Sequence, residues 1–161
     1  MRIAPAQRGE IKNRLMDEMR VHVGDEATFS KTVSESDVYL FAGLTGDLAP
    51  NHVNEEVMRR SRWGRRMVHG ALLVGFMSTA ASLIAAPTIT PDATETPVAA
   101  GYDRIRFIAP VYFGDTVTVT FRVAEVDPVK RQAKADIRVT SRGKELVAVA
   151  TGILRWVPNP K

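Results

Sequence analysis

The second half of the chain alternates between apolar and polar residues. Residues 116–123 and 132–139 follow a period of two, which places apolar side chains on one face of a strand and polar ones on the other. Turn-forming residues separate these runs. The last run, 146–157, is apolar on both faces, which is typical of a central strand. The pattern predicts three or four antiparallel strands after residue 101.

A long uncharged segment precedes these strands. Residues 71–86 contain no charged side chain, and Pro87 follows them. Sixteen residues fall short of the roughly 20 that span a bilayer, so a helix buried on nearly all sides is favoured over a membrane span. Residues 88–100 carry two prolines and a scatter of Thr and Asp, and we expect a loop there.

Shorter elements are predicted in the first half. They are a turn at 23–25, a strand over 27–33, a short helix from Ser34 to about Gly46, a loop over 46–52 and a second short helix over 55–60. Ser34 followed by Asp37 resembles a capping box with a shortened acid. Pro50 prevents a continuous helix through the loop, and Asn54 can cap the second helix.

Length and composition indicate one soluble domain. A chain of 161 residues, 45% hydrophobic and 25% charged, fits a single globular domain with a real core. We expect an N-terminal arm over 1–22, one domain over 23–157 and a tail over 158–161. Charges break up the first twenty residues, so no signal peptide is expected and a cytoplasmic location is the default. The absence of cysteine excludes disulfides, thiolate metal sites and a cysteine nucleophile.

The order of these elements predicts an α+β fold. A long apolar helix is buried only if a curved sheet wraps around it, and hairpin-connected strands on its C-terminal side can do so. We therefore expect a curved antiparallel sheet wrapped around one long buried helix.

Candidate chemistry gathers in the loop and at the start of the long helix. Asp47 and His52 flank a proline, so two titratable side chains lie close without sharing a helix face. His69 and Gly70 stand where the helix begins, and helix starts leave backbone N–H groups unpaired. A carbonyl oxygen that becomes anionic could be stabilised there, because Gly70 permits close approach. The remaining histidine, His22, has no comparable neighbours in sequence.

These residues resemble a known family. Residues 41–52, FAGLTGDLAPNH, with residues 69–72, HGAL, are similar to the signature of the MaoC-like dehydratases, the (R)-specific enoyl-CoA hydratases of the hot-dog fold. The resemblance covers about residues 23–157 and extends to Phe107, Pro110, Val111, Gly114 and Asp115. Either half of the signature alone is weak, whereas the combination is fairly specific.

Three positions depart from the family pattern. Ala49 stands where Asn is usual, Asn51 where an apolar residue is usual, and Asn54 where Asp commonly follows the histidine. Ala49 removes an amide that could brace the loop, and Asn51 adds polarity beside His52. These departures concern rate and substrate choice more than reaction type.

The resemblance implies a hot-dog fold and a lyase that interconverts trans-2-enoyl and (3R)-3-hydroxyacyl thioesters of CoA or acyl carrier protein. Asp47 and His52 would bind the water, with Asp47 as base and proton shuttle, and the Gly70 N–H would meet the thioester oxygen. Ser78 matches a family serine with a supporting hydrogen bond. The family works without a metal, and its only cofactor is the CoA or phosphopantetheine of the substrate. We expect a homodimer or a larger even-numbered oligomer, with sites at the subunit boundary and no nucleic-acid or membrane partner.

Each residue also has a structural interpretation. Asp47 alone is more typical of a turn, His52 could be a hydrogen-bonded loop histidine, and for His69 we favour holding the loop above Gly70. Asp47, His52 and His69 together could form a two-histidine, one-carboxylate metal site, which we rank well below the catalytic interpretation. The Ser78 hydroxyl could simply bond a backbone carbonyl.

An arginine cluster precedes the long helix. Five arginines fall within residues 59–66, interleaved with Trp63, and the whole chain carries a net charge of +4. Arg62, Arg65 and Arg66, with Asn51, are candidates to bind the phosphates of CoA or of a carrier protein's phosphopantetheine. A solvated charged face is at least as strong an interpretation.

Two other functions stay open. A hot-dog thioesterase also aims a carboxylate and a helix start at a thioester, although thioesterases lack the Asp47–His52 pairing. A non-catalytic acyl-CoA-binding protein, or a basic nucleic-acid-binding module, would bind with strong salt dependence and show no turnover.

Overall fold

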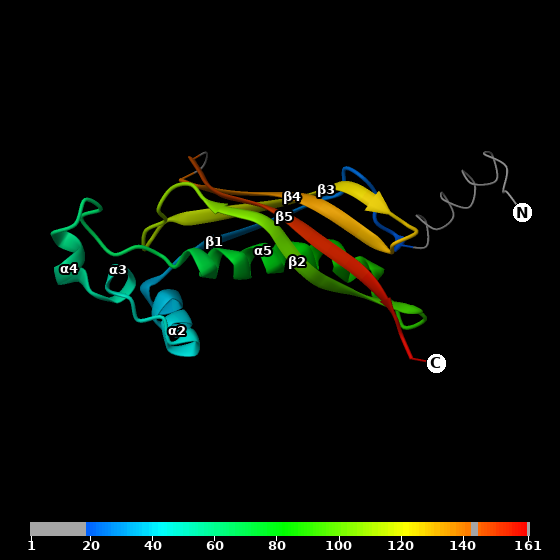
Figure 1. Ribbon diagram of the computed structural model, residues 1–161, viewed down its shortest axis with the longest axis horizontal. Coiled ribbons are helices and arrows are strands. Elements are labelled where there is room, and N and C mark those ends of the chain that lie inside the picture. Colours follow the sequence, from blue (N-terminus) through cyan, green and yellow to red (C-terminus); the bar gives the residue numbers. More distant parts are fainter. Residues whose placement is uncertain (1–18, 143–144, 161) are drawn as a thin grey trace, which may run out of the picture.

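The computed structural model describes residues 19–142 and 145–160, and over these residues five strands form one antiparallel sheet (Figure 1). The strands are β1 (Glu26–Thr32), β2 (Glu95–Phe107), β3 (Thr116–Asp127), β4 (Gln132–Ser141) and β5 (Glu145–Pro158), in the spatial order β1-β3-β4-β5-β2. The predicted antiparallel strands are confirmed. The two-sided apolar run forms β5, which lies between β4 and β2.

One face of the sheet packs against the hydrophobic core. Alternate residues of β3 and β4 are buried, as their period of two predicts. Gly152 of β5 lies so close to the ring of Phe121 that an added Cβ would be 2.6 Å from it. The interior is therefore close-packed around Phe121, and only glycine fits opposite it.

The long helix α5 (Gly70–Ala85) runs along the inner face of the sheet (Figure 1). Its buried side chains are Leu73, Phe76, Met77, Ala80, Ala81, Ile84 and Ala85. Burying side chains such as Leu73 or Phe76 contributes about 1.5–3 kcal/mol each. Its opposite side is exposed at Ala71, Gly75, Ser82 and Leu83, so the expected burial on nearly all sides is wrong for the single chain. A five-stranded sheet covers only one side of the helix.

The helix continues into a 3₁₀ turn, η1 (Ala86–Thr88), and Gly70–Thr88 is long and apolar enough to cross a membrane by length and composition alone. The buried side of α5 packs against β1, β3 and β2. The segment is thus the helix that packs against the sheet.

Three short helices project beyond one end of the sheet, near the start of α5 (Figure 1). They are α2 (Glu35–Thr45), α3 (Pro50–Val53) and α4 (Glu55–Arg59). The predicted capping box is present, because Ser34 and Asp37 exchange backbone and side-chain hydrogen bonds. Gly46 ends α2 with a φ of 77°, a left-handed conformation that favours glycine. Asn54 caps α4 as predicted.

Two expectations about loops are wrong. Residues 50–53 form α3, because proline is well suited to the first position of a helix, where no N–H donor is needed. Strand β2 begins at Glu95 inside the expected loop. β2 is an edge strand, and an edge strand tolerates Pro97 because its open side has no neighbouring strand to bond. Two register shifts also break the alternation of apolar and polar residues along β2.

Two of the first described residues belong to the core. Met19 and Val21 are 0% and 1% exposed. Most of the predicted arm, residues 1–18, lies outside the described part of the chain. The division into arm, domain and tail therefore stays a prediction.

Candidate active site

Asp47, His52 and His69 lie together beside the start of α5. Each offers a nitrogen or oxygen atom within 4.8 Å of the others. His52 belongs to α3 and His69 directly precedes α5, and both are buried. Their rings stack with centroids 3.7 Å apart. The Asp47 side chain is 49% exposed. The fold thus brings together the acid and the two histidines that the sequence singled out.

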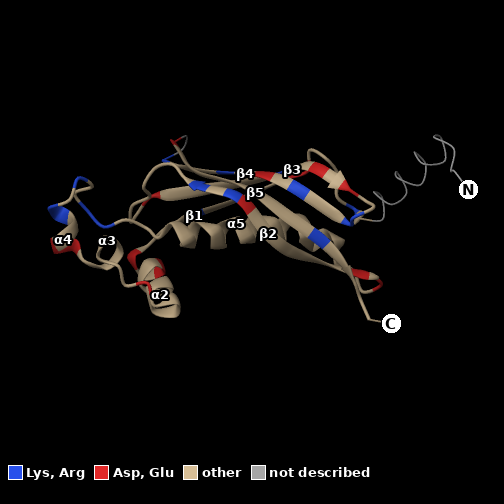
Figure 2. Cartoon of the chain, in the orientation of Figure 1, with Lys and Arg blue, Asp and Glu red and all other residues tan. Residues whose placement is uncertain are grey.

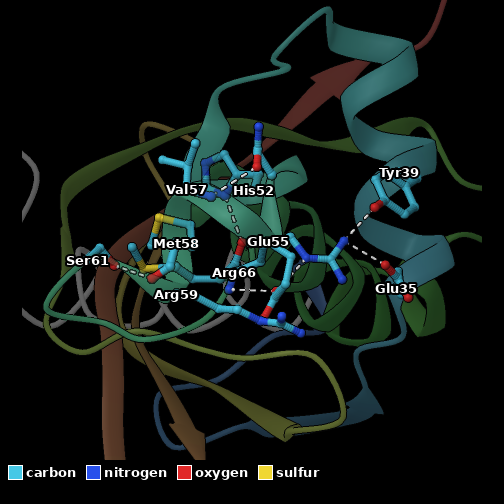
Figure 3. Close-up of polar contacts among 11 residues, drawn as sticks. Glu35, Tyr39, His52, Glu55, Val57, Met58, Arg59, Ser61 and Arg66 are labelled. Atoms are coloured by element: carbon cyan, nitrogen blue, oxygen red, sulfur yellow. Dashed lines mark hydrogen bonds and ion pairs between the residues drawn. The ribbon is translucent and has the colours of Figure 1, made fainter.

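Hydrogen bonds fix the protonation of the His52 ring (Figure 3). His52 Nδ1 lies 2.8 Å from the carbonyl oxygen of Met67, and a carbonyl can only accept, so Nδ1 carries the proton. The lone pair of the neutral ring is then on Nε2, where the side-chain amide of Asn51 donates at 2.9 Å. The backbone N–H of Met67 donates to Asn51 O at 3.0 Å. These bonds tie α3 to the segment that leads into α5.

The environment of His52 favours its neutral form. Burial lowers its pKa, and the neighbouring His69 lowers it further. The hydrogen bond to the Met67 carbonyl and the Asp47 carboxylate act in the opposite direction, but the net shift is downward. His52 is therefore a proton acceptor at neutral pH.

His69 holds the loop that carries the acid. Its Nε2 donates to the backbone oxygen of Asp47 at 3.0 Å and lies 3.9 Å from the carboxylate. Its ring also packs against Phe41 of α2, with centroids 4.9 Å apart. The hydrogen bond to Asp47 O is the contact expected of a histidine that holds the loop. The ring is 1% exposed, and its Nδ1 has no hydrogen-bond partner among the described residues.

A cavity of about 370 Å³ opens beside His52 and Gly70. Asn51, Trp63, Met67, Leu73, Phe107 and Ile108 also line it. The Phe107 ring lies against Gly70, since a Cβ at position 70 would be 2.8 Å from the ring. Sequence reasoning gave Phe107 no role, because nothing in the sequence pairs the end of β2 with the start of α5. Asp47 lies next to the histidines but outside the set of residues that line the cavity.

Ser78 lies away from this cluster in the single chain. It is eight residues beyond Gly70 on α5, which corresponds to about 12 Å along a helix. It is half-buried near Tyr102 of β2, whose pKa is raised by burial and lowered by the Ser78 hydroxyl, with a net rise. A supporting role for Ser78 therefore stays a prediction.

The arginine cluster divides into two groups. Figure 2 shows basic residues along α4 and the segment that follows it. Arg66 bonds Glu35, Glu55 and the Tyr39 hydroxyl, and its side chain is only 15% exposed (Figure 3). Arg59 and Arg60 pair with Glu55 and Glu56. Arg66 thus links α2, α4 and the segment that follows α4, whereas Arg59 and Arg60 pair with acids of α4 itself.

Arg62 and Arg65 are placed differently. Arg62 lies 4.8 Å from the ring centre of Trp63, and Arg65 lies 3.8 Å from that of Tyr112. Both side chains belong to exposed residues, and Trp63 lines the cavity. Of the predicted phosphate-binding arginines, these two have no acidic partner among the described residues, and neither lines the cavity itself.

The cluster is less suited to a metal than its composition suggests. A metal ligand must offer a lone pair, yet His69 Nε2 donates its hydrogen to Asp47 O and His52 Nε2 accepts from Asn51. A metal bound through these nitrogens would have to break both contacts.

Comparisons with known proteins identify the family of the chain. The MaoC-like domain matches residues 20–145. An (R)-specific enoyl-CoA hydratase of Rhodospirillum rubrum is 36% identical over 124 residues, covering 77% of this chain and 81% of that protein. A 3-hydroxybutyryl-CoA dehydratase of Methylorubrum extorquens is 32% identical over 126 residues, covering 74% and 75%.

A solved structure matches the fold. The (R)-hydratase from A. caviae involved in PHA biosynthesis superposes with a TM-score of 0.73 at 25% identity, covering 84% of this chain and 96% of that one. The predicted α+β hot-dog fold, with its sheet around a long helix, is confirmed. The MaoC-like domain matches residues 20–145, and the acid, the histidines and the helix start lie in one place, so the chain belongs to the MaoC-like dehydratase family.

Proposed function

We propose that this protein is a hydro-lyase that interconverts trans-2-enoyl and (3R)-3-hydroxyacyl thioesters of CoA or acyl carrier protein. The observation that carries the proposal is the convergence of a carboxylate and a neutral, buried imidazole beside the first amides of α5. The relatives named as enoyl-CoA hydratase and hydroxybutyryl-CoA dehydratase support the same reaction class.

Hydration needs a base for water, a proton for C2 and a site for the enolate oxygen. A water held between Asp47 and His52 adds its oxygen to C3 of the enoyl group and gives up a proton to Asp47. The pair of electrons moves to the thioester oxygen, which the Gly70 N–H stabilises. Asp47 then delivers the proton to C2, so the bound water is consumed and the carboxylate is restored. The reverse sequence is dehydration.

No metal enters this scheme, because the carboxylate carries the proton and the imidazole holds the water. The only cofactor is the CoA or phosphopantetheine carried by the substrate. Arg62 and Arg65 are proposed to bind its phosphates at the cavity mouth, whereas Arg66 is engaged by Glu35 and Glu55. We place this chemistry in the cytoplasm.

A second copy of the chain is proposed to complete the site. Strand β2 is an edge, and large apolar side chains are exposed beside it and on the uncovered side of α5: Leu83, Val98, Phe107 and Ile108. Pairing two such edges in a homodimer would bury these side chains and cover the half-exposed Asp47 carboxylate. Larger even-numbered oligomers can be built from the same dimer. Ser78 is assigned its supporting hydrogen bond in that assembly.

Incubation with crotonyl-CoA tests the function. Hydration removes the enoyl absorbance without releasing free thiol, whereas a thioesterase releases thiol. Salt-sensitive binding without turnover would identify a binding protein instead. Asp47→Asn and His52→Ala should each lower turnover by about 100-fold or more, the scale of a positioned acid or base, while circular dichroism still shows the wild-type fold. Near-normal turnover in either variant would overturn its assigned role.

A further inference from the structure

The side chain of Asn51 occupies the one nitrogen of His52 that can accept a proton. Because His52 Nδ1 donates to the Met67 carbonyl, the lone pair of the neutral ring is on Nε2. The Asn51 amide nitrogen lies 2.9 Å from Nε2 and can only donate. An imidazole nitrogen has a single in-plane lone pair, so a water molecule and Asn51 compete for it.

The His52 ring itself is held in place. It is 9% exposed, stacks on His69 at 3.7 Å and is bonded through Nδ1. Asn51 is less buried, and its side chain lines the cavity beside His52. In the hydrogen bond between Asn51 and His52, the Asn51 amide is therefore the group that can turn away when a ligand enters the cavity.

We propose that Asn51 is a positioning residue that controls access to His52: its amide holds the Nε2 lone pair in the free protein and yields it to water when the thioester binds. The inference rests on the proposed function, since it concerns the water that the hydration consumes. It also gives a physical meaning to the polar residue at position 51, where the family pattern has an apolar one.

Replacing the amide should free the lone pair. Asn51→Leu keeps the approximate volume of the side chain and removes the donor, and Asn51→Ala removes the donor with less bulk. Both variants should hydrate crotonyl-CoA with a kcat/KM about two- to tenfold above that of the wild type, the range of one neutral hydrogen bond. A residue that merely supports the fold would lower kcat/KM. Equal or lower values in both variants overturn the inference.

A carboxylate at the same position gives an independent readout. Asn51→Asp accepts from Nε2–H, raises the pKa of His52 and so should move the acid limb of the kcat/KM profile upward by about one pH unit or more. The other charged or titratable groups facing His52, Asp47 and His69, are unchanged in this variant.

Asn54→Asp is the matched control. It introduces the same charge three residues away and keeps an acceptor for the capping bond to Val57 N. Its pH profile should stay that of the wild type. Equal shifts in the Asn51 and Asn54 variants would mean that charge, rather than contact with Nε2, moves the profile, and would overturn the inference.

Different outcomes overturn the proposed function and the role of Asn51. A wild type that hydrates no enoyl thioester overturns the proposed function and the role of Asn51 with it. An active wild type whose Asn51→Leu and Asn51→Ala variants are no faster overturns the role of Asn51 alone.

Discussion

Gly70→Ala tests whether the start of α5 must stay open to the substrate. The glycine does not have a positive φ, so alanine suits its backbone. The new methyl group, however, would lie 2.8–2.9 Å from three carbons of the Phe107 ring. Ordinary carbon–carbon contacts are about 3.5–4.0 Å. The ring must therefore withdraw by roughly 0.7–1 Å.

Stability should change little in this variant. Phe107 is 53% exposed and stands at the end of β2, so its ring can rotate at a cost of about 0.5–1.5 kcal/mol. Alanine recovers part of this cost, because it leaves the unfolded backbone less freedom than glycine does, by about 0.4–1 kcal/mol. We expect a net change in unfolding free energy within about 1 kcal/mol of zero.

Activity should change much more than stability. The methyl group stands beside the amide that is proposed to meet the thioester oxygen, and loss of one oxyanion donor typically costs about 100- to 1,000-fold. Partial obstruction should lower kcat/KM for crotonyl-CoA by at least about tenfold. The assay pairs kcat/KM with a urea melt of the same preparation. An unchanged kcat/KM would refute the reasoning.

A double variant identifies the cause of the loss. Phe107→Leu removes the ring that clashes, and the single variant is the reference. If the methyl group blocks the amide, Gly70→Ala remains impaired in the Phe107→Leu background. Recovery there would mean that the displaced ring, rather than the obstructed amide, causes the loss.

Two further predictions concern stability. Gly152→Ala should lower the unfolding free energy by about 1–3 kcal/mol, because its methyl group would lie 2.6 Å from the buried Phe121 ring and 2.9 Å from Ile137; an unchanged denaturant midpoint would contradict this. The lowered pKa of His52 means that the unfolded chain binds a proton more readily, so stability should fall as pH drops below about 6.5. Melts at pH 7.5 and 5.5 should show a smaller fall in His52→Gln than in the wild type, and equal falls would contradict the assigned shift.

Much of the fold could be predicted because its signals are local. The capping box at Ser34, the left-handed cap at Gly46 and the alternation in β3 and β4 each depend on neighbours within a few residues. Strand β2 could not be recognised in this way. Its proline is tolerated only because the strand lies at an edge, and edge position depends on the whole sheet order.

The candidate site likewise has some features that local sequence predicts and others that depend on the folded structure. Their short separation in sequence brought Asp47 and His52 together, and the helix start placed His69 and Gly70. The tautomer of His52 was not predictable, because it is fixed by the backbone carbonyl of Met67 fifteen residues away. The exposed side of α5 was not predictable either, because it depends on how much of the helix one curved sheet can cover, and the sequence pattern does not show this.

The departures at positions 49 and 51 have separate physical consequences. With alanine at 49, the loop is braced by other contacts: Asp47 Oδ1 accepts from Ala49 N at 3.3 Å, and His69 donates to Asp47 O at 3.0 Å. The amide at 51 instead bonds the His52 imidazole that is proposed to hold the water. Loop geometry is thus maintained without an asparagine at 49, whereas the polar residue at 51 acts on the lone pair that hydration needs. A change at position 51 should therefore affect the rate, while the reaction type continues to depend on Asp47 and His52.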